Sequence, residues 1–144
     1  MAESEFKIKM IDWSSFTDFE DLSSGNFGVI RKADYLGTDV AIKEFKVEKG
    51  FNLDKYVGRE LGILRESRHP NVVQFMGTTQ HEGRLFMVTE YVGGGNLKSW
   101  IKDKSRDLSW RLRVSFALDV ARALAYLHSN KIIHRDLKSE NLLI

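Results

Sequence analysis

The sequence predicts an α+β fold in which a five-stranded antiparallel sheet with one helix precedes a mainly helical region. Two patterns support this prediction. Up to about residue 91, most apolar residues follow the two-residue spacing of strands, which are bounded by glycine-containing turns. Beyond that point, apolar residues recur every three or four positions, as on one face of a helix.

Three strands are predicted within residues 20–46. Two turn sequences separate them, Ser23–Gly28 and Leu36–Asp39, and both contain glycine. In the third strand, successive side chains point to opposite faces of the sheet. This alternation places Val40 and Ile42 on one face and the neighbouring side chains on the other.

Two further strands are predicted at residues 72–77 and 85–91, joined near Glu82–Gly83. They complete a five-stranded sheet. Between the third and fourth strands, residues 53–67 are predicted to form a helix that ends before Pro70. Its apolar stripe is formed by Val57, Leu61 and Leu64.

The remaining residues predict a short helix at 96–102 and a long one at 109–129. Residues 132–144 are predicted to form short extended pieces around a polar loop. One face of the long helix is apolar, and it carries Trp110, Val114, Ala117, Leu118, Ala121, Leu124 and Ala125.

Composition excludes several classes of function. The chain has 144 residues and no cysteine, so it has neither disulfides nor a thiol nucleophile. Its 22 basic and 20 acidic residues are interspersed and give a net charge of +2, which does not indicate a nucleic-acid-binding surface. No apolar run approaches the ~20 residues that span a membrane, and the N-terminus is not a secretory signal. We therefore expect a cytoplasmic protein without nucleic-acid or membrane partners.

The segment from His134 to Asn141 reads H-R-D-L-K-S-E-N. It resembles the catalytic loop of eukaryotic protein kinases, H-R-D-L-x-x-x-N. The resemblance implies that Asp136 is the base or orienting group for the attacking hydroxyl. Lys138 would neutralise charge on the transferred phosphoryl group, and Asn141 would bind Mg²⁺ through its side-chain oxygen. The alternative for this segment alone is a polar loop that follows a buried helix.

The sequence Val40–Lys43 resembles the kinase strand whose lysine holds the α- and β-phosphates of ATP. The resemblance implies that Lys43 forms an ion pair with Glu60 on the helix that follows. Without its context, a strand that ends in lysine is common, and Glu60 would be read as part of a solvated helix face.

The segment Ser23–Ile30 resembles the glycine-rich phosphate loop of kinases, G-x-G-x-x-G-x-V. Gly25 and Gly28 are present, whereas Ser23 replaces the first glycine and Ile30 replaces the valine. Glycines let the backbone approach phosphates and offer N–H donors to them. Taken alone, the segment would be read as a hairpin turn.

Residues Met87–Val92, followed by three glycines, resemble the kinase hinge. The resemblance makes Thr89 the gatekeeper and directs the Glu90 carbonyl and the Val92 amide to the adenine edge. Asn96 would lie near the ribose. The apolar residues that would enclose the purine are Leu22, Ile30, Ala41 and Leu143.

These motifs occur in kinase order, and the resemblance covers residues ~12–144. It implies a flank at 1–12, a kinase N-lobe at 13–91, and a hinge with an incomplete helical C-lobe at 92–144. Lys138 is typical of serine/threonine kinases. The lead-in around Trp13 and the H-P-N-V-V-Q-F-M-G sequence resemble the tyrosine-kinase-like group, near Raf and mixed-lineage kinases. The implied cofactors are ATP and Mg²⁺, and the implied partner is a protein substrate.

The 144 residues contain no D-F-G magnesium motif and no activation loop. We therefore expect a kinase fragment that ends after the catalytic loop and has little or no activity by itself. The alternative function is a non-catalytic module that binds nucleotide or a kinase partner. The apolar face of helix 109–129, together with a strand at 142–144 that lacks its hairpin partner, predicts homodimerisation or segment exchange.

Overall fold

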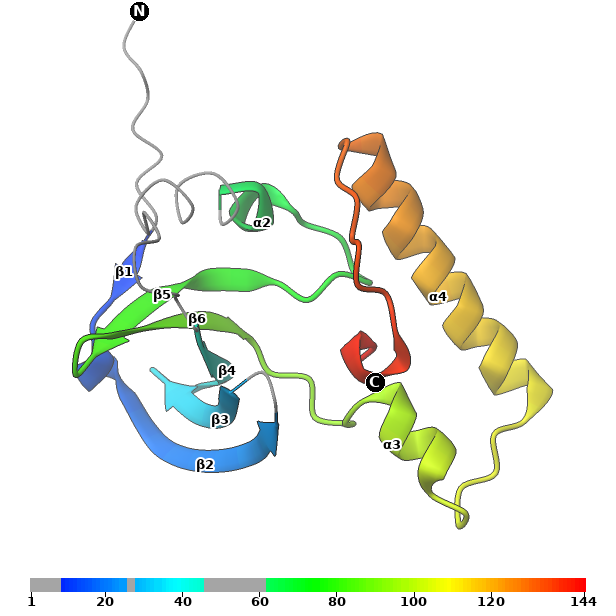
Figure 1. Ribbon diagram of the computed structural model, residues 1–144, viewed down its shortest axis with the longest axis horizontal. Coiled ribbons are helices and arrows are strands. Elements are labelled where there is room, and N and C mark those ends of the chain that lie inside the picture. Colours follow the sequence, from blue (N-terminus) through cyan, green and yellow to red (C-terminus); the bar gives the residue numbers. More distant parts are fainter. Residues whose placement is uncertain (1–8, 26–27, 46–61) are drawn as a thin grey trace, which may run out of the picture. The chain divides into compact units, whose positions relative to one another are not determined.

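The computed structural model describes residues 9–25, 28–45 and 62–144. The chain divides into two compact units (Figure 1). The N-terminal unit comprises Met1–Arg68 and Gln74–Tyr91, and the C-terminal unit comprises His69–Val73 and Val92–Ile144. The first contains the sheet, and the second contains the longer helices.

The N-terminal unit contains one six-stranded sheet with the strand order β1-β5-β6-β4-β3-β2. The five predicted strands are present, and every pair among them is antiparallel. Their bounds are β2 (Phe16–Gly25), β3 (Gly28–Tyr35), β4 (Thr38–Glu44), β5 (Phe75–His81) and β6 (Arg84–Glu90). The predicted fold class is therefore confirmed.

A sixth strand, β1 (Met10–Ile11), pairs in parallel with β5. The sequence placed these two residues in the flank, because two residues are too few to show a strand period. The backbones of Lys9 and Gly77 approach closely at this pairing. A Cβ at position 77 would lie only 2.8 Å from the carbonyl oxygen of Lys9, which is too close for a side chain. Glycine at position 77 therefore leaves room for the added strand.

Val40 and Ile42 form the centre of the core and are 0% and 1% exposed, as expected for two residues on one face of a strand. Trp13 covers one side of this core, and its ring packs 5.1 Å from that of Phe86. The other buried members of the cluster are Ile11, Phe16, Ala33 and Val88.

Three predicted elements differ in their bounds. β2 begins at Phe16, before the predicted region 20–46. β5 begins at Phe75 rather than at residue 72, because a turn comes first: the Val72 amide donates to the carbonyl of His69. Helix α2 is described over Gly62–Glu66. The rest of the predicted helix, with Val57, Glu60 and Leu61, lies outside the described residues.

In the C-terminal unit, helices α3 (Leu97–Lys102) and α4 (Trp110–Ser129) match the prediction, and the short helix η3 (Ser139–Asn141) follows. Each longer helix has a side-chain N-cap. Asn96 Oδ1 accepts from the Ser99 amide at 2.9 Å, and Ser109 Oγ accepts from the Leu112 amide at 3.2 Å. No helix among the described residues is long and apolar enough to cross a membrane.

The apolar face of α4 is exposed, as the sequence predicted. Trp110, Val114 and Leu118 are 77%, 63% and 46% exposed. The opposite face packs within the unit, where Leu127 is buried and Phe116 contacts the Trp100 ring edge-on. α4 therefore carries apolar side chains on two faces: one face packs within the unit, and the predicted stripe stays largely exposed.

The predicted strand at 142–144 forms backbone contacts within the C-terminal unit. The Leu97 amide donates to the Leu142 carbonyl at 2.8 Å, and the Ile144 amide donates to the Gly95 carbonyl at 2.9 Å. Leu143 forms the corresponding bridge with Asn96. Its partner lies more than 40 residues away in sequence, so local patterns could not reveal the pairing.

Candidate active site

Four of the predicted nucleotide-binding residues share one face of the sheet. Ile30 pairs with Lys43 across β3 and β4, and Lys43 pairs with Met87 of β6. Two residues away along β4, Ala41 pairs with Thr89. Directly opposed residues in an antiparallel sheet project to the same side, and residues two apart do so as well. Ile30, Ala41, Lys43 and Thr89 therefore lie together, on the face opposite Val40 and Ile42.

The predicted phosphate loop is the tip of the β2–β3 hairpin. Ser23 pairs with Ile30 and Gly25 pairs with Gly28, while residues 26–27 between them lie outside the described part. A register shift between Asp21 and Ser23 places Leu22 in an irregularity of the strand, where it is 40% exposed. The two glycines thus form the last pair of the hairpin before its turn.

The end of β6 is held in place through Glu90. Its amide donates to the Gln74 carbonyl at 2.9 Å, and its carboxylate accepts from the Gln74 amide at 2.8 Å. The Thr89 hydroxyl donates to the Glu90 carbonyl at 3.1 Å. This carbonyl, which the sequence assigned to the adenine edge, keeps a second lone pair for another donor.

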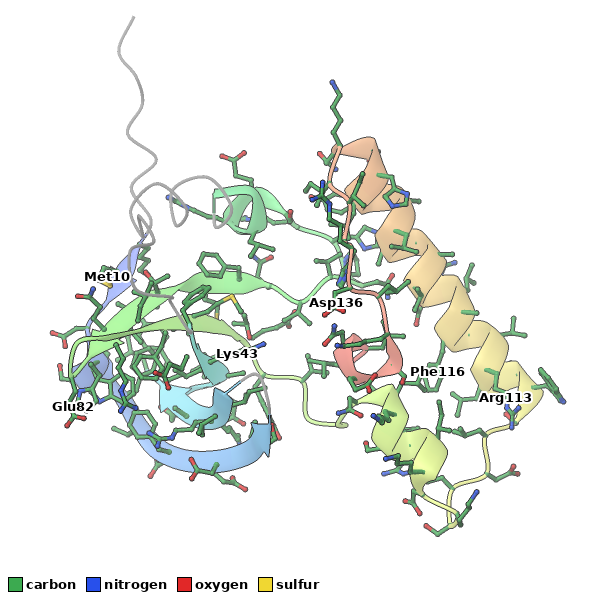
Figure 2. The ribbon with its side chains drawn as sticks, viewed as in Figure 1. Met10, Lys43, Glu82, Arg113, Phe116 and Asp136 are labelled. Atoms are coloured by element: carbon green, nitrogen blue, oxygen red, sulfur yellow. The ribbon has the colours of Figure 1, made fainter. Side chains whose placement is uncertain are left out.

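The catalytic-loop residues Asp136, Lys138 and Asn141 come together in the C-terminal unit. Figure 2 marks Asp136. The Lys138 ammonium lies 3.4 Å from Asp136 Oδ1. The Asn141 amide nitrogen donates to Asp136 Oδ2 at 3.1 Å and to the Asp136 carbonyl at 2.8 Å. The carboxylate is 61% exposed and therefore accessible to a substrate hydroxyl.

The backbone of the loop fixes the direction of Asp136. Its amide donates to His134 Nδ1 at 3.1 Å, so the histidine acts as a local acceptor within the loop. Arg135 between them has φ of 65°, a left-handed conformation that is uncommon outside glycine. η3 then returns Asn141 to the carboxylate. These bonds orient the Asp136 side chain before any substrate binds.

The donor set fits part of a Mg²⁺ site. Mg²⁺ binds near-octahedral oxygen ligands. Asn141 uses its amide nitrogen toward Asp136, which leaves its oxygen without a hydrogen bond among the described residues. The described chain contains no group of three acidic or histidine residues that could hold a metal ion. Asn141 can thus supply one ligand, and phosphate oxygens and water would supply others.

Lys98 and Glu140 form an ion pair that the sequence did not reveal. The Lys98 ammonium donates to Glu140 Oε1 at 2.5 Å and joins α3 to η3. The hydrogen bond from Lys98 is the main reason that the pKa of Glu140 falls from 4.5 to about 2. The two residues are 42 positions apart, so no local sequence pattern links them. This pair supports the turn that carries Asn141.

Three other predicted residues belong to the C-terminal unit. The side-chain oxygen of Asn96 caps α3, so its amide nitrogen is the group left for a ligand. Leu143 is 46% exposed, and its backbone pairs with Asn96. Val92 is half-buried. The predicted Lys43–Glu60 pair cannot be placed, because Glu60 lies outside the described residues.

Comparison with known proteins identifies the family. The family model for protein tyrosine and serine/threonine kinases matches residues 16–144. A probable serine/threonine-protein kinase of Dictyostelium discoideum is 43% identical over 145 residues, which cover 99% of this chain and 28% of the relative. The probable serine/threonine-protein kinase kinX of the same organism is 43% identical over 93% of this chain and 13% of its own length. A RasGEF domain-containing serine/threonine-protein kinase, also from that organism, is 43% identical over 93% of this chain and 14% of its own length.

The chain therefore belongs to the protein tyrosine and serine/threonine kinase family. It spans less than a third of the length of these three relatives. Enzymes of this family position ATP with a glycine-rich loop and a strand lysine, and they use a catalytic-loop aspartate to orient the acceptor hydroxyl. In this chain Gly25 and Gly28 lie in the β2–β3 hairpin, Lys43 lies in β4, and Asp136 lies in the loop after α4.

Proposed function

We propose that this chain is the ATP-binding and catalytic-loop portion of a serine/threonine protein kinase. The observation that carries the proposal is the contact set of Asp136, Lys138 and Asn141. The sheet face with Ile30, Ala41 and Lys43 supports it, because a strand lysine beside small and apolar residues suits a nucleotide.

In the proposed reaction, the hydroxyl of a protein side chain attacks the γ-phosphorus of ATP. The bond between this phosphorus and the β,γ-bridging oxygen breaks, and ADP leaves. Asp136 orients the hydroxyl and accepts its proton. Lys138 lies beside the carboxylate and stabilises negative charge on the transferred group. When Mg²⁺ is bound, it neutralises charge on the phosphates, and Asn141 supplies one of its ligands.

We infer serine or threonine as the acceptor residue from Lys138 and from the names of the relatives. The lead-in at Trp13 and the His69–Gly77 sequence support membership of the tyrosine-kinase-like group. The 144 residues lack a D-F-G motif, so we expect them alone to transfer phosphate poorly. The cytoplasmic location remains a prediction from the absence of cysteine.

Transfer of radiolabelled phosphate from ATP to a protein substrate tests this function. The assay compares the 144-residue chain with a form extended through the D-F-G motif and the rest of the kinase domain. In the extended form, Asp136→Asn should lower kcat by about 10²–10⁴-fold, because the positioned base is lost. Asp107→Asn makes the same chemical change at an exposed residue outside the loop and should leave kcat unchanged. Full activity of the Asp136→Asn variant would refute the assignment.

Lys43→Met tests the sheet half of the site separately. The loss of the ammonium should weaken productive placement of the ATP phosphates, so kcat/KM for ATP should fall in the extended form. Unchanged kcat/KM would show that Lys43 is misassigned even if Asp136 is correct.

We propose self-association as a second function, favoured by the exposed stripe Trp110, Val114 and Leu118 on α4. Segment exchange through residues 142–144 is less favoured, because this segment already pairs with Gly95–Leu97. Sedimentation of the 144-residue chain should show a dimer that Val114→Glu disrupts. A stable monomer at high protein concentration would refute this function without affecting the kinase assignment.

A further inference from the structure

A cluster of positive charge surrounds the connection between α3 and α4. Residues 101–113 contain five cations and two carboxylates, a net charge of +3, whereas the whole chain has +2. Figure 1 shows that the end of α3 and the beginning of α4 lie at one end of the C-terminal unit. We call this surface the basic end, and it comprises Lys102, Lys104, Arg106, Trp110, Arg111 and Arg113.

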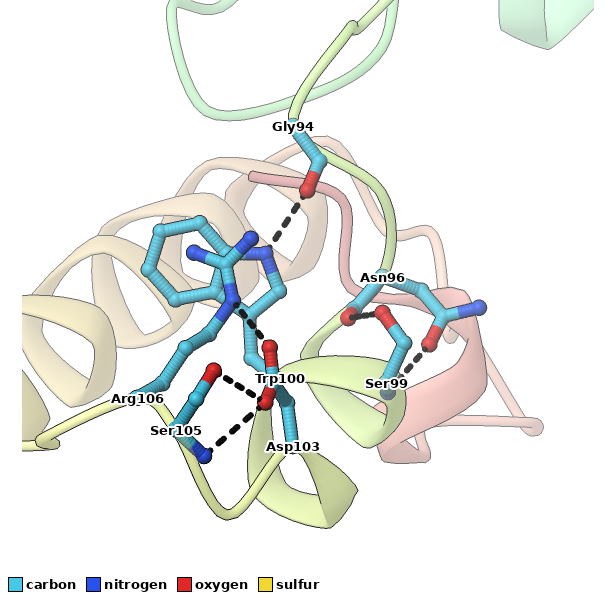
Figure 3. A network of polar contacts seen from close by, with 7 residues as sticks. All are labelled: Gly94, Asn96, Ser99, Trp100, Asp103, Ser105 and Arg106. Carbon is cyan, nitrogen blue, oxygen red and sulfur yellow. Dashed lines mark hydrogen bonds and ion pairs between the residues drawn. The ribbon is translucent and has the colours of Figure 1, made fainter.

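Arg106 makes two contacts within the basic end (Figure 3). Its guanidinium carbon lies 4.0 Å from the centre of the Trp100 ring, and its Nε donates to Asp103 at 3.2 Å. The ring is fixed in turn, because its Nε1 donates to the Gly94 carbonyl at 2.7 Å. Neither terminal nitrogen of Arg106 forms a hydrogen bond with the described residues.

Arg113 packs in a similar way on Trp110. Its guanidinium carbon lies 4.9 Å from the centre of the Trp110 ring, and its Nε donates to the Leu108 carbonyl at 2.8 Å. Both arginines thus use Nε and a ring face internally. Their terminal nitrogens form no hydrogen bond with the described residues, and a guanidinium presents such nitrogens to a carboxylate as two parallel hydrogen bonds.

The two carboxylates of residues 101–113 leave a net charge of +3. Asp103 pairs with Nε of Arg106 and also accepts from the Ser105 amide at 3.0 Å and the Ser105 hydroxyl at 2.6 Å. These bonds keep the pKa of Asp103 below 3.8, its ordinary value. Lys102, Lys104 and Arg111 are exposed and form no ion pair with any residue that the structure describes.

Exposed apolar side chains accompany the cations. Trp110 is 77% exposed and Ile101 is 54% exposed. A partner that contacts the basic end therefore meets apolar surface as well as positive charge. Tryptophan and arginine are the residue types that most often dominate binding energy at protein interfaces.

We propose that the basic end binds an acidic segment of another protein that contains at least one aromatic or aliphatic side chain. Carboxylates of the partner would meet the terminal nitrogens of Arg106 and Arg113, with Lys102, Lys104 and Arg111 around them. An anionic membrane suits the surface less well, because lipid headgroups do not require the paired hydrogen bonds that a guanidinium forms with a carboxylate.

Fluorescence anisotropy of a labelled acidic peptide, EEDFEELD, tests the proposal with the 144-residue chain. Binding should saturate and should weaken with salt. Lys104→Glu and Arg111→Glu together should weaken it by about tenfold or more, because like charges then face the peptide. Replacing the phenylalanine and leucine of the peptide by serine should also weaken binding. No nucleotide is involved, so the result is independent of the phosphate-transfer assay.

The matched control is Lys131→Glu, compared with the single variant Lys104→Glu. Both residues are exposed, both changes alter the net charge equally, and Lys131 lies beyond the other end of α4. Circular dichroism should show unchanged helix content in each variant. If Lys131→Glu weakens peptide binding as much as Lys104→Glu does, the effect is one of overall charge, and the proposal is overturned. Absence of peptide binding, with or without binding to vesicles that contain phosphatidylserine, would also overturn it.

Discussion

The two units of this chain differ in how they bury apolar surface. The N-terminal unit contains nine of the buried hydrophobic residues among the described part of the chain, and the C-terminal unit contains one, Leu127. In the sheet, cross-strand pairing brings residues such as Ala33 and Val40 into one cluster. In the C-terminal unit, three large apolar residues of α4 remain exposed. Hydrophobic stabilisation is therefore concentrated in the sheet.

The C-terminal unit relies more on specific polar contacts. Side chains cap both longer helices, an ion pair joins Lys98 to Glu140, and the Trp100 indole binds the Gly94 carbonyl. Such contacts each contribute less than a buried apolar side chain. Hydrogen bonds of the same unit, from the Asp136 amide to His134 and from Asn141 to Asp136, orient the Asp136 side chain. The comparison suggests that the sheet supplies stability and the C-terminal unit supplies orientation.

The largest expected effect is the loss of a core side chain. Ile42→Ala should lower the free energy of unfolding of the sheet by about 2–5 kcal/mol, because Ile42 is 1% exposed and its removal leaves a cavity. Leu118→Ala on the exposed face of α4 should cost less than about 1 kcal/mol. Urea denaturation followed by hydrogen exchange in each unit measures both. If both substitutions lower the free energy of unfolding equally, hydrophobic stabilisation is not concentrated in the sheet.

Gly94→Ala should release the C-terminal segment. A Cβ at position 94 would lie only 1.9 Å from the Ile144 carbonyl oxygen, so the segment must move. The two backbone hydrogen bonds that hold residues 142–144 would be lost, at a cost of about 1–3 kcal/mol. Faster hydrogen exchange at the amides of Leu97 and Ile144 would report the release. Unchanged protection of these amides would contradict the close approach.

Loss of the N-cap of α4 should have a smaller effect. Ser109→Ala removes the acceptor for the Leu112 amide and should destabilise the C-terminal unit by about 1 kcal/mol. Ser115→Ala is the matched control, because Ser115 is exposed within the same helix and alanine favours helix formation there. Thermal unfolding of both variants makes the comparison. A cost for Ser115→Ala as large as that for Ser109→Ala would argue against a capping role.

The smallest effect is the pH dependence of the Lys98–Glu140 pair. The pKa of Glu140 is lowered to about 2 in the folded chain from its ordinary value of 4.5. Its contribution to stability is therefore present above about pH 4.5 and is lost as the pH falls toward 2. A carboxyl titration by NMR measures this pKa, and Lys98→Met should raise it. A Glu140 pKa that Lys98→Met does not change would show that another group lowers it.

Much of the fold could be predicted because it depends on local rules. The five strands, the short helix that begins near Asn96 and the long helix after Ser109 each follow a pattern of neighbouring residues. Bounds were less accurate where a turn intervened, as at His69–Val72 before β5. The residues of the catalytic loop could also be predicted, since Asp136, Lys138 and Asn141 lie within six positions.

The sequence by itself determined the strand and helix pattern, the family motifs and the exposed apolar face of α4. Only the tertiary structure decided the parallel pairing of β1 with β5, the pairing of residues 142–144 with Gly95–Leu97, and the Lys98–Glu140 ion pair. Each of these joins residues that are 40 or more positions apart or depends on a two-residue strand. Hydrophobic periodicity shows which face of a helix or strand a residue occupies. It does not show which distant segment packs against that face, because this depends on the tertiary fold.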